Sequence, residues 1–343
     1  MTISTQNQNI NNINNDVKEI SDALLKFDSW TIFTHKKPDG DAAGSATALI
    51  GAGILNGKKI KWIGADKYPP ENYYFLPHLN FYECCEDFKF NDPNELYIFL
   101  DCANETRSVK NFSKTANTIN IDHHEDNNLY AKLNYVDGRA SSTCEMLMRI
   151  FMAENWKLNK NIAESLYTGI FTDTGGFTFS NCSSLTHKII SELINLGVDP
   201  GHMGDLITQN KTPEGIALWS RALSRIKIID EIFALSWINM QDFRETRAKN
   251  TDTEGLPNML MSIKNIKFAV LLYENLNSEI RASFRSREGI FFGAGEIARL
   301  YGGGGHERAA GATLRGSVEN ILIELENLLS KKYHDGNGNN FNK

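Results

Sequence analysis

The sequence predicts an α/β protein of two domains: an N-terminal domain built on a parallel sheet, and a smaller C-terminal α/β domain with a cleft between them. The chain has 343 residues, more than the roughly 100–200 residues of one typical domain. Over its first two thirds, short apolar runs alternate with helix-spaced segments, which is typical of a parallel sheet with helices on both faces. The composition changes after residue 201, and a second α/β pattern begins at Ile226.

The elements of the first domain follow from apolar spacing. Helices are predicted over residues 17–27, 42–55, 142–154, 161–171 and 185–196. Strands are predicted over residues 30–34, 60–63, 96–100 and 118–121. Ser142 and Glu145 have the spacing of a capping box, in which each side chain bonds the backbone N–H of the other residue. Ligands of parallel sheets bind beyond the carboxyl ends of the strands, so the residues after these strands are the first candidates for a site.

The second domain has a similar but shorter pattern. Strands are predicted over residues 233–237, 267–273 and 279–284, and helices over 293–301 and 318–329. The predicted boundaries are a disordered leader (1–16), a first domain (17–200), a helical linker (201–225), a second domain (226–332) and a disordered tail (333–343).

Composition excludes several classes of protein. The formal net charge is −6, which disfavours sequence-independent wrapping of long nucleic acid but allows a small anionic substrate. Five cysteines, an odd number without a Cys-x-x-Cys pair, disfavour a disulfide framework and a zinc ribbon. Reduced thiols, a polar N-terminus and the absence of long apolar runs predict a cytoplasmic protein without a membrane partner.

Polar residues gather after the predicted strands and at one helix end. They are His35, Asp39, Asp41, Asp101, Asp122, His123, His124 and Asp173. Two like charges about 4 Å apart repel by roughly 4 kcal/mol at an effective dielectric constant near 20, so a shared crevice would need a cation. Carboxylates with imidazoles suit Mn²⁺, Mg²⁺, Fe²⁺ or zinc, and several carboxylates can hold two ions. Each residue alone also has a plain structural explanation, such as a turn at Pro38–Asp41.

Together these segments resemble a known family. HKKPDGDAAGS, FLDCAN, IDHH and FTDTGGF, in this order, are similar to the four motifs of the DHH phosphoesterase superfamily. GGGGHERAAGA at residues 302–312 resembles the signature of the DHH-associated C-terminal domain. The resemblance covers about residues 20–330, and it is nearest to the two-domain, NrnA-like nanoRNases that also act as phosphatases on 3′-phosphoadenosine 5′-phosphate (pAp).

The resemblance implies roles for the polar residues. One divalent ion, with Mn²⁺ the first choice, would be bound by His35, Asp39 and Asp101. A second ion would be bound by Asp41, Asp101, His123 and Asp173, with Asp101 bridging the two ions. Asp122 would orient a ligand histidine, and His124 would face the scissile phosphate.

The second domain is expected to bind the substrate. Arg281, Ser283 and Arg285 alternate along a strand and therefore share one face. Arginine suits phosphate oxygens, and the glycines at 302–305 let backbone N–H groups approach an anion. The expected substrate-binding residues are Arg281, Ser283, Arg285, Gly304, Gly305, His306 and Arg107. The alternatives are a solvated strand face and a plain flexible loop.

The resemblance therefore implies a metal-dependent phosphoesterase that hydrolyses short oligoribonucleotides and pAp through a water activated by two metal ions. The alternatives are hydrolysis of cyclic di-AMP or a linear dinucleotide, an exopolyphosphatase-like activity, and a non-catalytic nucleotide sensor. The expected partners are short RNA, dinucleotides and nucleotide 3′,5′-bisphosphates, and a homodimer is left open.

Overall fold

A computed structural model describes residues 15–114, 116–209, 211–274, 279–287, 289–305 and 307–338. The chain divides into two compact units, Met1–Asn210 and Lys211–Lys343, and each is described by itself. The predicted linker is not a separate part. Helix α6 (Pro200–Thr208) lies in the first unit and helix α7 (Pro213–Ser224) in the second. The predicted cleft between the domains stays a prediction.

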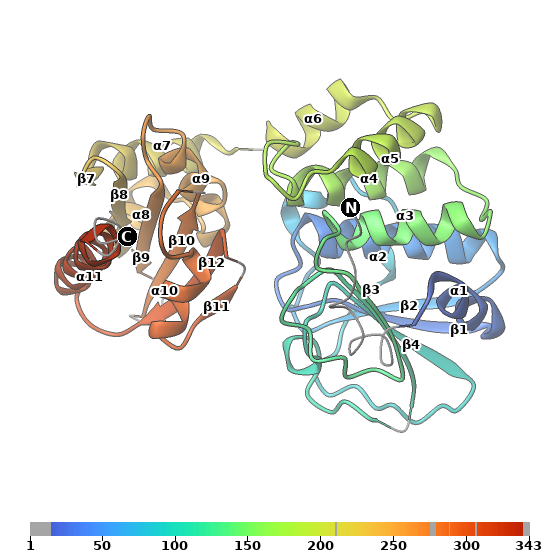
Figure 1. Ribbon diagram of the computed structural model, residues 1–343. Helices are drawn as coiled ribbons and strands as arrows, with labels where there is room; N and C mark the ends of the chain where they lie inside the picture. Colours follow the sequence, from blue (N-terminus) through green and yellow to red (C-terminus); the bar gives the residue numbers. More distant parts are fainter. Residues whose placement is uncertain are drawn as a thin grey trace, which may run out of the picture. The chain divides into compact units, whose positions relative to one another are not determined.

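A six-stranded parallel sheet forms the frame of the first unit (Figure 1). In sheet order the strands are β3 (Tyr82–Cys84), β2 (Lys59–Gly64), β1 (Ser29–Phe33), β4 (Glu95–Leu100), β5 (Asn117–Asp122) and β6 (Leu133–Val136). The predicted parallel sheet and its four predicted strands are confirmed. The sequence did not reveal β3 and β6, because these edge strands are short and only partly buried.

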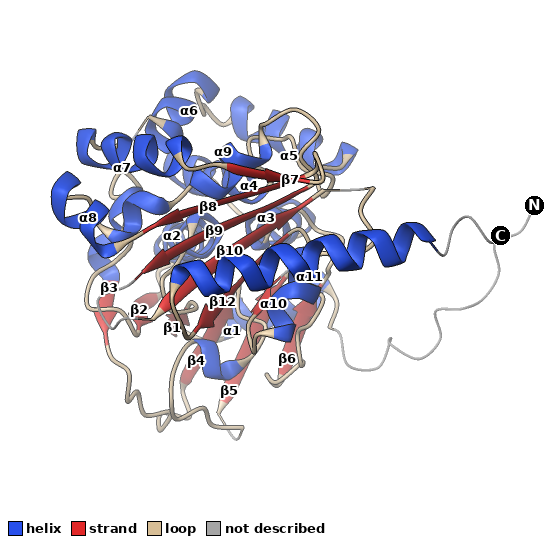
Figure 2. Cartoon of the chain, turned by 90° about the vertical axis from the view of Figure 1, so that its left-hand side faces the viewer, coloured by secondary structure: helices blue, strands red, loops and turns tan. Residues whose placement is uncertain are grey.

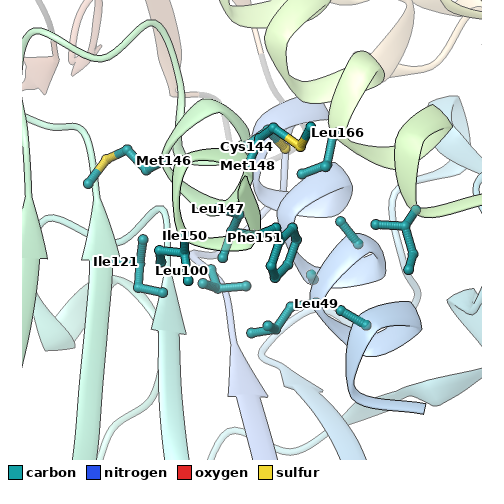
Figure 3. Close-up of a cluster of buried hydrophobic side chains, with 14 of the residues drawn as sticks. Leu49, Leu100, Ile121, Cys144, Met146, Leu147, Met148, Ile150, Phe151 and Leu166 are labelled. Atoms are coloured by element: carbon teal, nitrogen blue, oxygen red, sulfur yellow. The ribbon is translucent and has the colours of Figure 1, made fainter. Parts of the chain in front are cut away.

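Helices lie on one face of this sheet in two layers. Helices α1 (Val17–Lys26), α2 (Gly40–Leu55) and α3 (Thr143–Ala153) contact the strands, and α4 (Lys160–Asp173) and α5 (Ser184–Asn195) pack on α2 and α3. Figure 3 shows side chains of α3, among them Leu147 and Ile150, beside Leu100 and Ile121 of the sheet. This packing forms the largest hydrophobic core of the chain's described part.

The opposite face of the sheet is covered by loops, so the expectation of helices on both faces is wrong for the described residues. Phe33 and Phe99 stack on this face with ring centroids 4.8 Å apart. Phe88 and Phe90, from the connection between β3 and β4, pack against them. Aromatic side chains from irregular segments thus bury the surface that crossover helices would otherwise cover.

Short 3₁₀ helices occur in the connections. They are η1 (Glu71–Tyr73), η2 (Leu79–Phe81), η3 (Glu105–Arg107) and, in the second unit, η4 (Asn250–Thr253). None of the helices in the described ranges is long and apolar enough to cross a membrane.

The second unit is a mixed sheet between two layers of helices (Figure 2). In sheet order the strands are β11 (Gly304–Gly305), β12 (Ala309–Leu314), β10 (Ile280–Ser286), β9 (Phe268–Glu274), β8 (Phe233–Ile238) and β7 (Lys227–Ile229). Helices α10 (Ala294–Leu300) and α11 (Val318–Gly338) pack on one face. Helices α7, α8 (Met240–Thr246) and α9 (Leu256–Met261) pack on the other.

The last helix is longer than predicted. Residues 333–338, which the sequence analysis assigned to a disordered tail, continue α11. The reason is tertiary packing: the Tyr333 ring lies 5.9 Å from that of Phe233, and Lys332 pairs with Glu296 at 2.6 Å. Residues 1–14 of the predicted leader and 339–343 of the tail lie outside the described residues, whereas Asp16 caps α1.

Candidate metal centre

The polar segments meet at the carboxyl edge of the first sheet. Strands β1, β4 and β5 are adjacent and parallel. The connections run to opposite sides of the sheet at β1 and β4, which is the position where open α/β sheets bind ligands. His35 follows β1, Asp101 follows β4, and His123 follows β5. The expected convergence of strand-end residues is therefore present.

The first group of possible ligands contains His35, Asp39 and Asp101. The Nε2 atom of His35 lies 3.4 Å from Asp101 Oδ2 and 3.7 Å from Asp39 Oδ1. Its other ring nitrogen, Nδ1, donates to the carbonyl of Lys36 at 2.8 Å. This bond fixes the ring so that Nε2, the nitrogen that could bind a metal, faces both carboxylates.

The second group contains Asp41, His123 and Asp173. His123 Nε2 lies 3.3 Å from Asp173 Oδ2, 3.9 Å from Asp41 Oδ2 and 3.5 Å from Asp101 Oδ1. Asp101 thus directs Oδ1 toward this group and Oδ2 toward His35. That is the geometry a carboxylate needs to bridge two ions.

Backbone groups hold the aspartates in place. Asp39 caps α2 by accepting from the N–H groups of Asp41 and Ala42 at 3.1 Å. Asp41 accepts from the N–H of Thr143 at 2.6 Å and of Cys144 at 2.9 Å, at the start of α3. Unsatisfied N–H groups at a helix start favour a negative charge, so α3 stabilises the ionised form of Asp41.

Close helix packing leaves room for the Asp41 carboxylate. A Cβ atom on Gly169 of α4 would lie 2.7 Å from Asp41 Oδ1 and 2.2 Å from Cys144 Sγ. A Cβ atom on Gly44 of α2 would lie 2.6 Å from the carbonyl oxygen of Ser165. Both positions therefore require glycine. Asp101 itself has a φ of 57°, a left-handed conformation of the kind that occurs at functional sites.

The predicted capping box at α3 is only half formed. Ser142 Oγ accepts from the Glu145 N–H at 3.0 Å, as expected. The Glu145 carboxylate does not return this bond. It accepts instead from Ser141 Oγ and Thr186 Oγ1, each at 2.6 Å, and pairs with Arg149. A buried carboxylate is stabilised better by several donors than by one backbone N–H, which explains the difference.

The pKa shifts of the two groups show that their carboxylates lack compensating positive charge. Burial raises the pKa of Asp41 to about 7, and the nearby Asp101 carboxylate adds to the shift. Burial lowers the pKa of His123, but Asp173, Asp101 and Asp41 raise it more, to about 10. For Asp101, burial favours the protonated form, yet the hydrogen bond from His35 and the charges of the other histidines lower its pKa. Histidine protons thus compensate the carboxylates when no cation is bound.

This donor set fits a divalent cation. Across the described segments, the only ion-pair partners of Asp39, Asp41, Asp101 and Asp173 are histidines, with no Lys or Arg among them. Carboxylates and imidazoles are the ligands of Mn²⁺, Mg²⁺, Fe²⁺ and zinc. Within each of the two groups the candidate ligand atoms lie within 4.8 Å of one another.

Asp122 orients His124 rather than a histidine of these two groups. His124 Nδ1 donates to Asp122 Oδ1 at 2.7 Å, and Asp122 is fully buried. His124 also forms a third group of possible ligands with Asp101 and His123, so the role that the resemblance implies for Asp122, orienting a ligand histidine, stays a prediction. His124 also lies near the metal groups, since its Nδ1 is 3.5 Å from Asp101 Oδ1.

Asn127, which the sequence analysis missed, fixes the other side of Asp122. Its Nδ2 atom donates to Asp122 Oδ2 at 2.6 Å and to Asn120 Oδ1 at 2.7 Å. In the sequence, Asn127 stands in a polar segment that reads as a turn. An amide side chain five residues after an aspartate is a weak signal that the two side chains are hydrogen-bonded.

Replacing Asn127 by leucine is expected to lower kcat about 10–100-fold with little change in KM, because residues that orient a functional side chain have effects of this size. The measurement is steady-state kinetics together with a thermal melt. Asn128→Ala is the matched control, since the Asn128 side chain bonds only the half-buried Glu105 carboxylate among the described contacts. A parallel rise in KM, or loss of kcat only through unfolding, would contradict the orienting role.

The predicted substrate residues of the second unit lie on and beside β10. Arg281 is exposed, while Ser283 and Arg285 are half-buried. Arg285 Nε donates to Asn258 Oδ1 of α9 at 2.9 Å, and burial lowers the pKa of this guanidinium. Arg281 Nη1 donates to Thr313 Oγ1 at 2.6 Å. A half-buried guanidinium that donates to neutral acceptors, here Asn258 Oδ1 and the Phe284 carbonyl, is suited to an anionic ligand.

The glycine run is more regular than expected. Gly304 and Gly305 form strand β11 and pair with Gly311 and Ala310 of β12. Gly303 must be glycine, because a Cβ atom there would lie 2.2 Å from the carbonyl oxygen of Gly311. His306 lies outside the described residues.

Arg107 lies beside the metal groups of the first unit. Its carbonyl accepts from the N–H of Lys36, which follows His35, at 2.8 Å. Its side chain is exposed at the end of η3. The structure therefore brings Arg107 close to the loop that carries His35 and Asp39.

Known proteins resemble the chain over most of its length. A bifunctional oligoribonuclease and PAP phosphatase NrnA of Bacillus subtilis is 28% identical over 322 residues, which cover 90% of this chain and 97% of that protein. The protein of the same name from Thermus thermophilus is 31% identical over 286 residues, covering 83% and 84%. The crystal structure of an exopolyphosphatase-related protein from Bacteroides fragilis is 25% identical, with a TM-score of 0.84, covering 92% of this chain and 95% of that one.

Family models match both units. The model of the DHH family, N-terminal domain, matches residues 29–170 and so includes all the strand-end residues from His35 to His124. The model of the DHHA1 domain matches residues 233–331, which include β10 and the glycine run. The chain therefore belongs to the DHH family and carries an N-terminal DHH domain followed by a DHHA1 domain.

Proposed function

We propose that this protein is a metal-dependent phosphoesterase that hydrolyses short oligoribonucleotides and pAp. The observation that carries the proposal is the position of Asp101, whose two carboxylate oxygens face two separate groups of histidine and aspartate. The relatives from Bacillus subtilis and Thermus thermophilus, both named as oligoribonuclease and PAP phosphatase, support the choice of substrates.

The two groups would hold two divalent ions, and we propose Mn²⁺ for both. His35, Asp39 and Asp101 would hold one, and Asp41, Asp101, His123 and Asp173 the other. Bound ions of this kind supply Lewis acidity and lower the pKa of water, which makes a nucleophile available near neutral pH. No serine or cysteine nucleophile is needed in such a reaction.

The residues of the chain would position the reaction. The water oxygen forms a bond to phosphorus while the bond from phosphorus to the leaving oxygen breaks, and that oxygen leaves with a proton. His124, held by Asp122, would place a donor near the phosphate and stabilise the charge that develops on its oxygens. Arg281, Ser283, Arg285, Gly304, Gly305 and His306 of the DHHA1 domain, with Arg107 of the DHH domain, would bind the remaining phosphate and base.

One experiment separates this function from its alternatives. The purified protein is incubated with Mn²⁺ and, in parallel, with pAp, the dinucleotide pApA, short RNA, cyclic di-AMP, pyrophosphate and polyphosphate. The proposal requires turnover of pAp and of short RNA. Polyphosphate is included because the Bacteroides fragilis structure is described as exopolyphosphatase-related. Rapid turnover of cyclic di-AMP or polyphosphate with none of pAp would reject the proposal, and binding without turnover of any compound would indicate a sensor.

Arg285→Ala is expected to lower kcat/KM for pAp about 10–100-fold, because hydrogen bonds to a charged group contribute about 1.5–3 kcal/mol. Arg285→Lys is expected to recover only part of this loss, since lysine cannot form the two parallel bonds of a guanidinium. Arg315→Ala is the control, because Arg315 is an exposed arginine of the same unit. Unchanged kcat/KM in Arg285→Ala would show that this side chain does not bind the substrate.

The homodimer and the cytoplasmic location stay predictions. Gel filtration with light scattering of the purified chain would decide the first, and cell fractionation the second.

A further inference from the structure

The loop after β2, residues 65–68, is fixed against the loop that carries His35 and Asp39. Strands β1 and β2 are parallel neighbours, so both loops leave the same edge of the sheet. The N–H of Lys37 donates to the Asp66 carboxylate, and the Tyr82 hydroxyl donates to the Asp66 carbonyl at 2.8 Å. Asp66 therefore ties the two loops together at the rim of the metal groups.

An aromatic ring and an ammonium group follow this anchor directly. Tyr68 is 61% exposed, among the most exposed large aromatic residues of the described chain. The Nζ atom of Lys67 lies 5.1 Å from the centroid of the Tyr68 ring. Two residues of extended chain span at most about 7 Å, so the backbone of Tyr68 lies within that distance of the backbone of Asp66. The Asp66 side chain in turn contacts Lys37.

An exposed tyrosine alone needs no explanation, because apolar atoms make up much of any protein surface. Two features distinguish Tyr68. Its loop is attached by a side-chain hydrogen bond to the loop of two candidate metal ligands, and it has a cation beside its ring. Proteins that bind single-stranded nucleic acid combine these two elements, with an aromatic face for a base and a positive charge for the backbone.

We propose that Lys67 and Tyr68 form a nucleoside subsite next to the metal groups, in which a base stacks on Tyr68 and the Lys67 ammonium lies near a phosphodiester. The inference rests on the proposed function and makes it more specific. A dinucleotide such as pApA carries one nucleoside more than pAp, on the far side of the scissile phosphate. The subsite would take this additional nucleoside, so it would favour oligonucleotides over the mononucleotide.

The test compares KM for pApA and for pAp in the full-length protein. Base–aromatic stacking of about 1–3 kcal/mol corresponds to about a 5–150-fold change in affinity. Tyr68→Ala is expected to raise KM for pApA at least about fivefold more than KM for pAp. Tyr68→Phe keeps the ring and is expected to stay near the wild type. Tyr74→Ala is the matched control, because Tyr74 is also exposed, at 55%, and lies six residues further along the chain.

A binding measurement separates the subsite from the catalytic proposal. A dinucleotide with 2-aminopurine as its second base is titrated with the protein in EDTA, where stacking quenches the fluorescence and no hydrolysis is expected. Quenching by the wild type and by Tyr74→Ala, but not by Tyr68→Ala, supports the subsite even if no substrate is turned over. Absent quenching in the wild type, equal quenching in Tyr68→Ala, or an equal rise of both KM values overturns it.

Discussion

Asp101→Asn is expected to lower kcat by more than about a thousandfold, which corresponds to about 4 kcal/mol of transition-state stabilisation. Asp101 is buried, and it is the residue whose two oxygens face His35 on one side and His123 on the other. Asparagine keeps the size of the side chain but removes the negative charge and replaces one oxygen by an NH₂ donor. One of the two groups then loses its shared ligand, whichever way the amide turns.

The control is Asp28→Asn at the opposite edge of the same sheet. The Asp28 side chain is 98% exposed and precedes β1, whereas Asp101 follows β4. Asp28→Asn is expected to keep the kcat of the wild type. Hydrolysis of pAp and short RNA with Mn²⁺ is the measurement, and circular dichroism checks that both variants fold. A loss of less than tenfold in a folded Asp101→Asn protein would mean that Asp101 does not bridge two ions.

The sequence was sufficient to predict where these polar residues converge, because they stand at strand ends. Buried parallel strands such as 96–100 are continuous apolar runs, so the first polar residue after each, such as Asp101, marks the carboxyl edge of the sheet. Parallel neighbours share that edge, and this alone predicts that His35, Asp101 and His123 converge. Which residue binds which ion was implied by the family resemblance and not by this pattern, and it stays a prediction.

The parts that sequence did not predict depend on contacts between distant segments. Glu145 has the spacing of a capping residue, but its carboxylate is bound by Thr186, which is 41 residues away. Asn127 stands in a polar turn, and its role appears only when Asp122 and Asn120 lie around it. The loop aromatics Phe88 and Phe90 have no period that would show them covering a sheet face. Local patterns carry no information on such partners.

Adding Mn²⁺ to the metal-free protein is expected to raise the Tm of the first unit by about 5–10 °C. A ligand at a concentration 100 times its Kd stabilises the folded state by about 2.7 kcal/mol, and for a domain of about 200 residues each kcal/mol shifts Tm by about 2–4 °C. The physical reason is that the metal-free unit buries Asp41 and Asp101 close together, and burial together with the Asp101 charge raises the pKa of Asp41 to about 7. A cation stabilises the folded state because the unfolded chain does not hold these carboxylates together.

The same melt distinguishes binding at this site from binding elsewhere. Calorimetry is carried out in EDTA and again with excess Mn²⁺, on the wild type, Asp101→Asn and Asp28→Asn. The rise in Tm on adding Mn²⁺ should be retained in Asp28→Asn. It should be much smaller in Asp101→Asn, which lacks the ligand shared by both groups. Asp101→Asn also loses the favourable contacts of this carboxylate with His35, His123 and His124, so in EDTA it is expected to melt below the metal-free wild type. The comparison therefore uses the Mn²⁺-induced change in Tm of each protein and not its absolute Tm. An equal Mn²⁺ shift in all three proteins would mean that the ion binds away from Asp101, and the assignment of these ligands would then fail even if the protein hydrolyses pAp.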